Sequence, residues 1–270
     1  MQKRPPRAMT IAGSDSGAGA GIQADLKTFA ALGVYGTSVL TAVTAQNTRA
    51  VTQVLELSPD LVAAQFDAVM ADIGADAIKT GMLPSAAIIE VVGTKLREHR
   101  GVPVVIDPVM EATSGDRLLK ADAVAALRVL LSLAIVVTPN APEAAVLSGK
   151  QVRNLEEARE AARAIHALGP KAVVVKGGHL GGAQSIDLLY DGVEFVELAA
   201  DRVETSSTHG TGCTFASAIA AGLAQGLELR LAVAQAKRYV TDTIRHAFPM
   251  GGGHGPLNHF YRWWETPARP

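Results

Sequence analysis

The sequence predicts an α/β fold in which one mainly parallel sheet is covered by helices on both faces. Short apolar runs rich in β-branched residues alternate with helical patterns along the chain, as in parallel strands joined by crossover helices. Polar residues follow directly after most of these runs. A length of 270 residues suits one such domain, spanning 1–270, and its first seven residues are expected to be flexible.

The first half of the chain supplies five expected strands, at 8–12, within 33–45, and at 51–57, 77–79 and 102–106. β-branched and aromatic side chains recur in the second of them, as a pleated surface favours. Ser58-Pro59 predicts a helix start, because serine caps a helix and proline suits its first position. A further helix between the last two strands has an apolar stripe at Ile88, Ile89, Val92 and Leu96.

The second half continues the pattern with strands at 134–137 and 172–175 and a hairpin turn at Asp191-Gly192. Asn154 and Glu157 have the spacing of a capping box, so a helix is expected to begin there. An Ala-rich helix follows Thr208, and another covers about 231–247. Trp263-Trp264 is expected to dock the tail onto the body.

Composition and charge exclude several classes of protein. Hydrophobic residues make up 48% and charged residues 19% of the chain, which excludes a disordered protein. The net charge of -1 offers no general positive field for a nucleic acid or an anionic membrane, so neither partner is expected. With one cysteine, no secretory signal and no continuous apolar span, the sequence favours a cytoplasmic location.

Four polar clusters follow predicted strands, and parallel strands place their carboxyl ends at one edge of a sheet. The clusters are 15–25, 79–82, 107–110, and Asn140 with Glu143. We therefore expect them to converge on one ligand crevice. Asp107 and Glu143 are hard oxygen ligands suited to Mg²⁺, although a carboxylate at this place can also cap a helix.

The segment His209-Gly210-Thr211-Gly212-Cys213 precedes the Ala-rich helix and is the strongest candidate for a phosphate site. Glycines allow backbone N–H groups to meet an anion at the positive end of a helix. The alternative is a helix start whose glycines serve only tight packing. Cys213 falls in the first helical turn, where the helix dipole is expected to lower its pKa, whereas a lone cysteine is otherwise a small buried apolar residue.

Other nucleotide and metal sites are disfavoured. Residues 19–24 satisfy the dinucleotide fingerprint, but no acidic residue lies between Asp25 and Glu56 to bind a ribose, so a nicotinamide cofactor is rejected. No Gly-x-x-x-x-Gly-Lys-Ser/Thr loop and no protein-kinase signature occurs. One Cys and seven scattered His provide no zinc cluster.

Several motifs, taken in order, closely resemble those of the bacterial hydroxymethylpyrimidine and phosphomethylpyrimidine kinases of thiamine synthesis. The resemblance runs from about Met9 to Trp264 and rests on segments 12–15, 19–28, 44–48, 79–83, 107–110, 138–144, 176–179, 209–214 and 254–259. It implies a ribokinase-like fold, ATP with Mg²⁺, a homodimer, and transfer of phosphate to the pyrimidine hydroxymethyl group and then to the monophosphate. It leaves a monovalent-cation requirement open.

The same resemblance assigns roles to individual positions. Cys213 stands where related sugar kinases have a catalytic aspartate, and Gly210, Thr211 and Gly212 form the anion-binding loop with it. Gln46 reads the aminopyrimidine edge, for which an amide offers both a donor and an acceptor. The remaining assignments are Asp25 to the hydroxymethyl group, Gly13, Met82 and Val109 to the pyrimidine site, Lys176, Asn140 and Thr208 to the nucleotide, and Asp107 and Glu143 to Mg²⁺.

Two positions depart from the family pattern. Ala18 stands where glycine is frequent, a change expected to add only a methyl group. Thr113 stands where some members have lysine, so a cation that could contact the monophosphate is missing.

Two alternative functions stay open. The first is a pyridoxal kinase of the same fold, because pyridoxal also carries a ring hydroxymethyl group, although Gln46 favours the aminopyrimidine. The second is a non-catalytic pyrimidine-binding protein, which has no need of both magnesium ligands and an anion loop.

Overall fold

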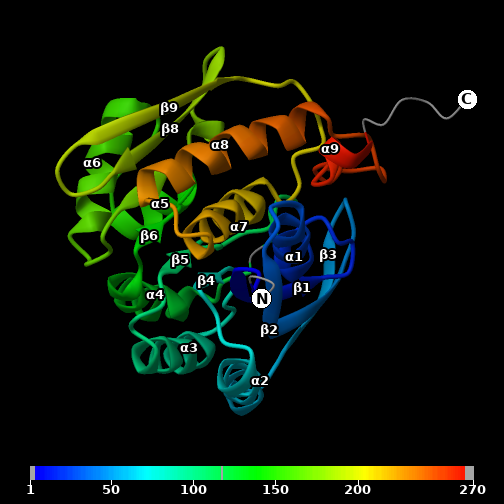
Figure 1. Cartoon of the computed structure of the whole chain (residues 1–270). Coiled ribbons are helices and arrows are strands. Elements are labelled where there is room, and N and C mark those ends of the chain that lie inside the picture. The colour runs from blue at the N-terminus through cyan, green and yellow to red at the C-terminus, as the bar shows by residue number, and fades with distance from the viewer. Residues whose placement is uncertain (1–3, 117, 265–270) are drawn as a thin grey trace, which may run out of the picture.

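A computed structural model describes residues 4–116 and 118–264 of the chain (Figure 1). Its strands are β1 (Arg7–Asp15), β2 (Tyr35–Gln46), β3 (Val51–Glu56), β4 (Ala77–Thr80), β5 (Val104–Ile106), β6 (Val136–Val137), β7 (Val173–Val175), β8 (Gln184–Tyr190) and β9 (Phe195–Asp201). Its helices are α1 (Gly21–Ala31), α2 (Pro59–Asp72), α3 (Ala86–Glu98), α4 (Val124–Leu130), α5 (Ala141–Ser148), α6 (Leu155–His166), α7 (Thr211–Ala224), α8 (Leu229–Arg245) and α9 (Tyr261–Trp264).

The nine strands form one sheet in the order β3-β2-β1-β4-β5-β6-β7-β8-β9. All neighbours from β2 to β7 pair in parallel. The edge strand β3 and the hairpin of β8 and β9 are antiparallel to their neighbours. The predicted mainly parallel sheet is therefore confirmed, and the hairpin turn lies at Asp191-Gly192, where Gly192 has a φ of 91°.

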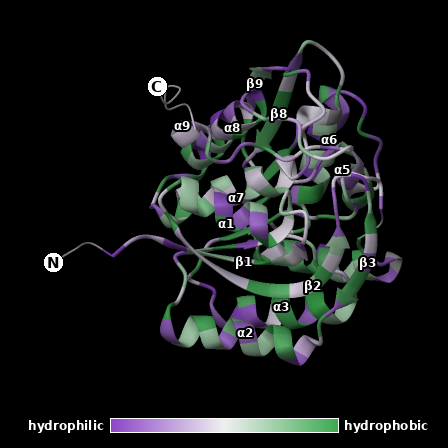
Figure 2. Ribbon diagram, turned by 90° about the vertical axis from the view of Figure 1, so that its right-hand side faces the viewer, coloured by the Kyte–Doolittle hydropathy of each residue, from purple (hydrophilic) through white to green (hydrophobic). Residues whose placement is uncertain are grey.

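Two apolar cores lie on opposite faces of this sheet. Alternate strand residues divide between them: Ile106 belongs to the core that α2 to α6 contribute to, while Val105 belongs to the core that α1, α7 and α8 contribute to. Figure 2 shows the sheet between the layer that contains α2 and α3 and the layer that contains α1 and α7. Helix α7 lies between α1 and α8 and is rich in Ala. Its small side chains let the two neighbouring helices approach closely.

Two of the predicted helix starts can be judged from their capping bonds. Ser58 caps α2, as predicted, since its side chain accepts from the backbone N–H of Leu61. The capping box predicted at Asn154 and Glu157 is only half formed: Asn154 accepts from Glu157 N, but the Glu157 carboxylate binds the N–H of Arg153. The complete capping box is at Asn140 and Glu143, on α5.

The ends of the chain correct two further expectations. Residues 1–3 lie outside the described residues, but Arg7, expected to be flexible, begins β1 and is fixed by hydrogen bonds to Asp76. At the other end, the tail docks through Leu257, His259 and Tyr261, which are all buried. The predicted anchor Trp264 stacks on Phe248 at a ring-centroid distance of 5.4 Å, yet it is 60% exposed.

Candidate active site

A cavity of about 630 Å³ opens at the carboxyl ends of the parallel strands. Polar residues from the ends of five strands line it, namely Ser14, Asp15, Thr44, Gln46, Asp107, Asn140, Glu143 and Lys176. The predicted convergence is confirmed for Asp15, for 107–110 and for Asn140 with Glu143, whereas Met82 alone represents the 79–82 cluster. The wall also includes Thr208 and the first turn of α7, so the phosphate-site candidate and the strand ends share one space.

The start of α7 is shaped for an anion. Gly210 caps the helix with a φ of 82°, a conformation that favours glycine, and a Cβ atom there would collide with the carbonyl oxygen of Gly19. The Thr211 hydroxyl donates to the carbonyl oxygen of Thr208 at 2.7 Å, which holds the turn closed. Thr211, Gly212 and Cys213 of this first turn line the cavity, so the positive end of a 14-residue helix lies at the cavity wall.

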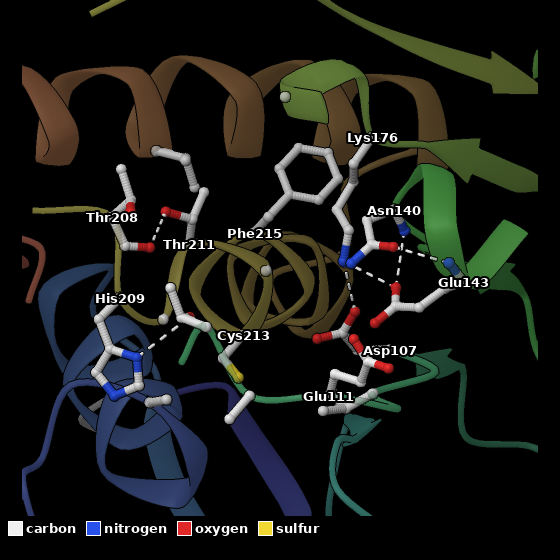
Figure 3. A pocket seen from close by; sticks show the side chains of 18 of the residues that line it. Asp107, Glu111, Asn140, Glu143, Lys176, Thr208, His209, Thr211, Cys213 and Phe215 are labelled. Atoms are coloured by element: carbon white, nitrogen blue, oxygen red, sulfur yellow. Dashed lines mark hydrogen bonds and ion pairs between the residues drawn. The ribbon is translucent and has the colours of Figure 1, made fainter. Parts of the chain in front are cut away.

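A cluster of charged residues lies across the cavity from His209, with Cys213 between them (Figure 3). Lys176 Nζ lies 2.8 Å from Asp107 Oδ1 and 3.8 Å from Glu143 Oε2. Although burial lowers it, these two carboxylates raise the pKa of Lys176 above its ordinary value, so the ammonium group is charged at neutral pH. Thr138 donates a further hydrogen bond to Asp107 Oδ1 at 3.1 Å.

Glu143 has two roles in this structure. Its Oε2 atom accepts from the backbone N–H of Asn140 at 2.7 Å and so completes the capping box of α5, while its side chain also lines the cavity. Burial, together with the nearby charge of Asp107, raises the pKa of Glu143 to about 7 despite the opposing effect of Lys176. The helix-cap and ligand interpretations of this residue are therefore compatible.

The donor set fits Mg²⁺. Among the residues described, no group of three or more His, Cys, Asp or Glu side chains could hold a metal by itself. Mg²⁺ in phosphate-transfer sites is bound by one or two carboxylates and completes its shell with water and phosphate oxygens. Asp107 and Glu143 provide two such carboxylates beside the anion loop.

The state of Cys213 differs from the sequence expectation. The helix dipole was expected to favour the thiolate, but burial raises the pKa of this thiol to about 11, and the charges of Asp25 and Asp107 add to the increase. Lys79 lowers it without offsetting burial. The thiol is consequently protonated at neutral pH, because desolvation outweighs the dipole.

Four residues assigned to the pyrimidine line the same cavity: Gly13, Gln46, Met82 and Val109. Gly13 leaves room for a neighbour, since a Cβ atom there would lie 2.9 Å from Met82 Sδ. Thr44 and His209 flank the amide of Gln46. The structure thus brings an apolar slot and one amide together next to the anion loop.

Asp25, by contrast, does not reach the cavity. Its side chain is fully buried and forms an ion pair with Lys79 at 2.8 Å, and Lys79 is fully buried too. Thr10 and Ser217 each donate a hydrogen bond to Asp25 at 2.6 Å. The expected contact with the hydroxymethyl group is therefore corrected: a sequence motif places Asp25 near the site but cannot show that its carboxylate turns into the core.

Asp15 and His209 lie within two of the sequence motifs, but the motifs gave neither residue a role. His209 Nε2 lies 2.9 Å from Asp15 Oδ2, and both side chains line the cavity. An apolar wall formed by Val203, Phe215, Val240 and Ile244 was not predicted from the sequence. No signal could have identified that wall, since apolar residues at helical spacing read as ordinary core.

The two departures from the family pattern differ in consequence. Ala18 has a φ of 59°, so its backbone lies in the left-handed region, which costs about 1–2 kcal/mol for a residue with a Cβ atom. The change therefore adds strain as well as a methyl group, contrary to expectation. Thr113 lines the cavity and lies 3.3 Å from His209 Nδ1, so a neutral hydroxyl occupies the position of the missing cation.

The fold and the site define a ribokinase-like small-molecule kinase: a mainly parallel sheet with an anion-binding helix start, a Lys–carboxylate cluster and a slot for a small ring, all in one cavity. The family model described as phosphomethylpyrimidine kinase matches residues 15–258. The chain belongs to that family.

Known proteins agree with this assignment. The chain is 54% identical over 262 residues to a hydroxymethylpyrimidine/phosphomethylpyrimidine kinase of Rhizobium meliloti, covering 96% of this chain and 98% of that protein. It is 55% identical to a thiamine biosynthesis bifunctional protein of Geobacter sulfurreducens, covering 93% of this chain but only 51% of that one. Among solved structures, a Bacillus subtilis pyridoxal kinase in complex with ADP is 41% identical with a TM-score of 0.90, covering 96% and 99% of the two chains.

Proposed function

We propose that this protein uses ATP to phosphorylate 4-amino-5-hydroxymethyl-2-methylpyrimidine, and then its monophosphate to the diphosphate, in thiamine biosynthesis. One observation carries the proposal: a single wall joins the anion loop, the Lys176 cluster and the ring slot. Gln46 and Cys213 both line this cavity, and the small ring with its hydroxymethyl group is assigned to the space between them. The names of the Rhizobium and Geobacter relatives support the same substrate and pathway.

The residues of the chain act mainly by positioning and charge stabilisation. Phosphoryl transfer has a loose transition state in most analyses, so fixed donors at the transferring group provide much of the catalysis. The first-turn N–H groups of α7 stabilise the oxygens of that group, and Lys176 compensates their charge. Asn140 and Thr208, which line the same cavity, would contact the nucleotide phosphates. Mg²⁺ held by Asp107 and Glu143 would neutralise phosphate charge as a Lewis acid.

The apolar wall of Val203, Phe215, Val240 and Ile244 is the place we assign to the nucleotide base. It lies in the same cavity as the anion loop, and aromatic or apolar side chains are the usual lining of such a slot. The sequence motifs assign only polar residues to the nucleotide. This apolar wall extends the nucleotide site toward α8.

A second candidate function is phosphorylation of pyridoxal. It is favoured by the similarity to the Bacillus subtilis pyridoxal kinase and by the hydroxymethyl group that both substrates carry. The two substrates differ in the ring edge that Gln46 faces, and an amide suits an edge with an amino donor next to a ring acceptor.

We also propose that the protein acts in the cytoplasm as a homodimer. Its single cysteine is compatible with a reducing compartment. The edge strand β3 exposes Val54 and Leu55, and a second copy of the chain could pack over this edge in a dimer. No helix within residues 4–116 and 118–264 has the length and apolar character needed to cross a membrane.

The experiment is mass spectrometry of the products formed with ATP, Mg²⁺ and either the hydroxymethylpyrimidine, its monophosphate or pyridoxal. We expect the mono- and diphosphate of the pyrimidine, and no product after Mg²⁺ is removed with EDTA. Pyridoxal phosphate alone would move the substrate to the second candidate. No product from any of the three would support a pyrimidine-binding protein instead.

A further inference from the structure

His209 connects four segments that are far apart in the sequence. Its Nε2 atom lies 2.9 Å from Asp15 Oδ2 and 3.4 Å from the Gln46 amide, and its Nδ1 atom lies 3.3 Å from Thr113 Oγ1. The ring is 6% exposed and packs against Gly19, where a Cβ atom would collide with it. His209 also directly precedes Gly210, so it links the ring slot to the anion loop.

The Asp15 carboxylate determines which ring nitrogen carries a proton. Although burial opposes it, the hydrogen bond from His209 and those from the backbone hold the pKa of Asp15 below its ordinary value, so the group is ionised. The other three hydrogen-bond partners of this carboxylate are the N–H groups of Gly17, Gly19 and Ala20. An ionised carboxylate only accepts, and therefore Nε2 of His209 carries a proton and donates it.

This proton in turn decides the orientation of the Gln46 amide. Its two terminal atoms lie 3.1 Å from Thr44 Oγ1 and 3.4 Å from His209 Nε2. With the oxygen toward Thr44, an N–H group of Gln46 would face the N–H group of His209. The Thr44 hydroxyl would also have to donate twice, since it already donates to the carbonyl oxygen of Ser14 at 2.9 Å. With the amide turned over, both conflicts disappear.

The consequence is a fixed pattern of donor and acceptor in the ring slot. The amide oxygen is the second acceptor of the His209 N–H group, which donates mainly to Asp15, so the three groups form a three-centre hydrogen bond and the amide oxygen keeps one lone pair. The amide nitrogen donates to Thr44 and keeps one N–H group. These two free groups match a ligand edge that presents an amino group next to a ring nitrogen. A ligand whose edge offers two acceptors or two donors finds one of them unmatched, which is costly in a buried slot.

We propose that His209 is a specificity-determining positioning residue, which fixes the Gln46 amide in the orientation that reads an aminopyrimidine edge. The proposal rests on the proposed function, because the ligand is the pyrimidine of that reaction. Asp15 acts one step further away, by holding the His209 ring in the required tautomer. Both residues act through Gln46, and neither takes part in the transfer of the phosphoryl group.

The test compares His209→Leu, His209→Asn and His209→Gln with the wild type. Glutamine can present an N–H group near the Nε2 position, whereas asparagine is one carbon shorter and leucine has no donor. We expect Leu and Asn to raise the KM of the hydroxymethylpyrimidine by about 10- to 100-fold, with kcat and the KM of ATP changed by less than about threefold. His209→Gln is expected to recover most of the lost affinity. If the Leu variant fails to fold, the Asn and Gln pair carries the comparison.

A double-mutant cycle with Gln46→Leu separates positioning from a general structural role. If His209 acts through Gln46, combining His209→Asn with Gln46→Leu adds no loss beyond Gln46→Leu alone. The proposal would be overturned by additive losses, or by equal increases in the KM values of the hydroxymethylpyrimidine and of ATP, provided that the wild-type enzyme still forms pyrimidine phosphates. A wild-type enzyme that forms none would instead overturn the proposed function.

Discussion

At the scale of single residues, Cys213 shows how burial can outweigh a favourable position. It lies in the first turn of α7, where the helix dipole favours a thiolate, but desolvation raises its pKa to about 11. A protonated thiol cannot accept the proton of a substrate hydroxyl. If Cys213 is the base, as the resemblance implies, only its small ionised fraction is active near neutral pH.

We therefore predict a steep pH dependence of the chemical step. The single-turnover rate is expected to rise about tenfold per pH unit between about pH 6.5 and 9 without a plateau, because the thiolate fraction rises in this way below a pKa of about 11. Cys213→Asp should flatten the profile, since a carboxylate is already ionised in this range. A flat wild-type profile would show that the proton does not go to Cys213.

At the scale of secondary-structure elements, a buried ion pair joins α1, β4 and α7 beneath the site. Asp25 of α1 accepts from Lys79 of β4 and from Ser217 of α7, and all three side chains are fully buried. Although burial lowers it, the charge of Asp25 raises the pKa of Lys79 above its ordinary value, so the Lys79 ammonium group is charged. Removal of one partner would leave an uncompensated charge in the core.

Lys79→Met is accordingly predicted to lower the free energy of unfolding by about 3–5 kcal/mol, measured by urea denaturation. Adding Asp25→Asn should recover about half of this loss, because the remaining buried group is then neutral while its oxygen still accepts from Thr10 or Ser217. The exposed pair of Arg153 and Glu157 is the matched control, and Arg153→Met should have a much smaller effect. A double variant no more stable than Lys79→Met would contradict the ionic explanation.

The elements themselves were largely predictable, because each is determined by local signals. The periodic spacing of apolar residues predicts the strands and helices, and Ser58 with Pro59 predicts the start of α2. The helix start predicted at Asn154 is confirmed, but its capping box is only half formed, whereas Asn140 and Glu143, with the same spacing, form a complete one. Only the neighbourhood distinguishes them: Arg153 N–H competes for the Glu157 carboxylate.

At the scale of the whole molecule, the C-terminal segment links two parts of the site. The N–H group of His209 donates to the carbonyl oxygen of Gly255 at 3.0 Å, and that of His254 donates to the carbonyl oxygen of Thr48 at 2.8 Å. The segment thereby joins the turn after β2 to the anion loop. Sequence motifs identified each part, but no local signal indicates such long-range pairs, just as none showed that Asp25 turns into the core.

His259 anchors this segment and gives it a pH dependence. Its Nε2 atom lies 3.0 Å from Thr214 Oγ1 on α7, and Tyr239 donates to its carbonyl oxygen at 2.9 Å. Burial, together with the charge of Lys27, lowers the pKa of His259 from 6.5 to about 4. In the unfolded chain the same imidazole binds a proton near its ordinary pKa. Protonation therefore favours the unfolded state between these two values.

The contribution of His259 to stability is full above about pH 6.5 and is lost as the pH falls toward about 4, by about 3 kcal/mol in total. Glu143, whose pKa is raised to about 7, has the opposite effect, so the wild type alone does not isolate the histidine. We predict that the difference in unfolding free energy between the wild type and His259→Gln shrinks by this amount from about pH 7 to 4, because Glu143 contributes equally to both proteins and cancels. A difference that is independent of pH would mean that His259 is not buried as a neutral ring.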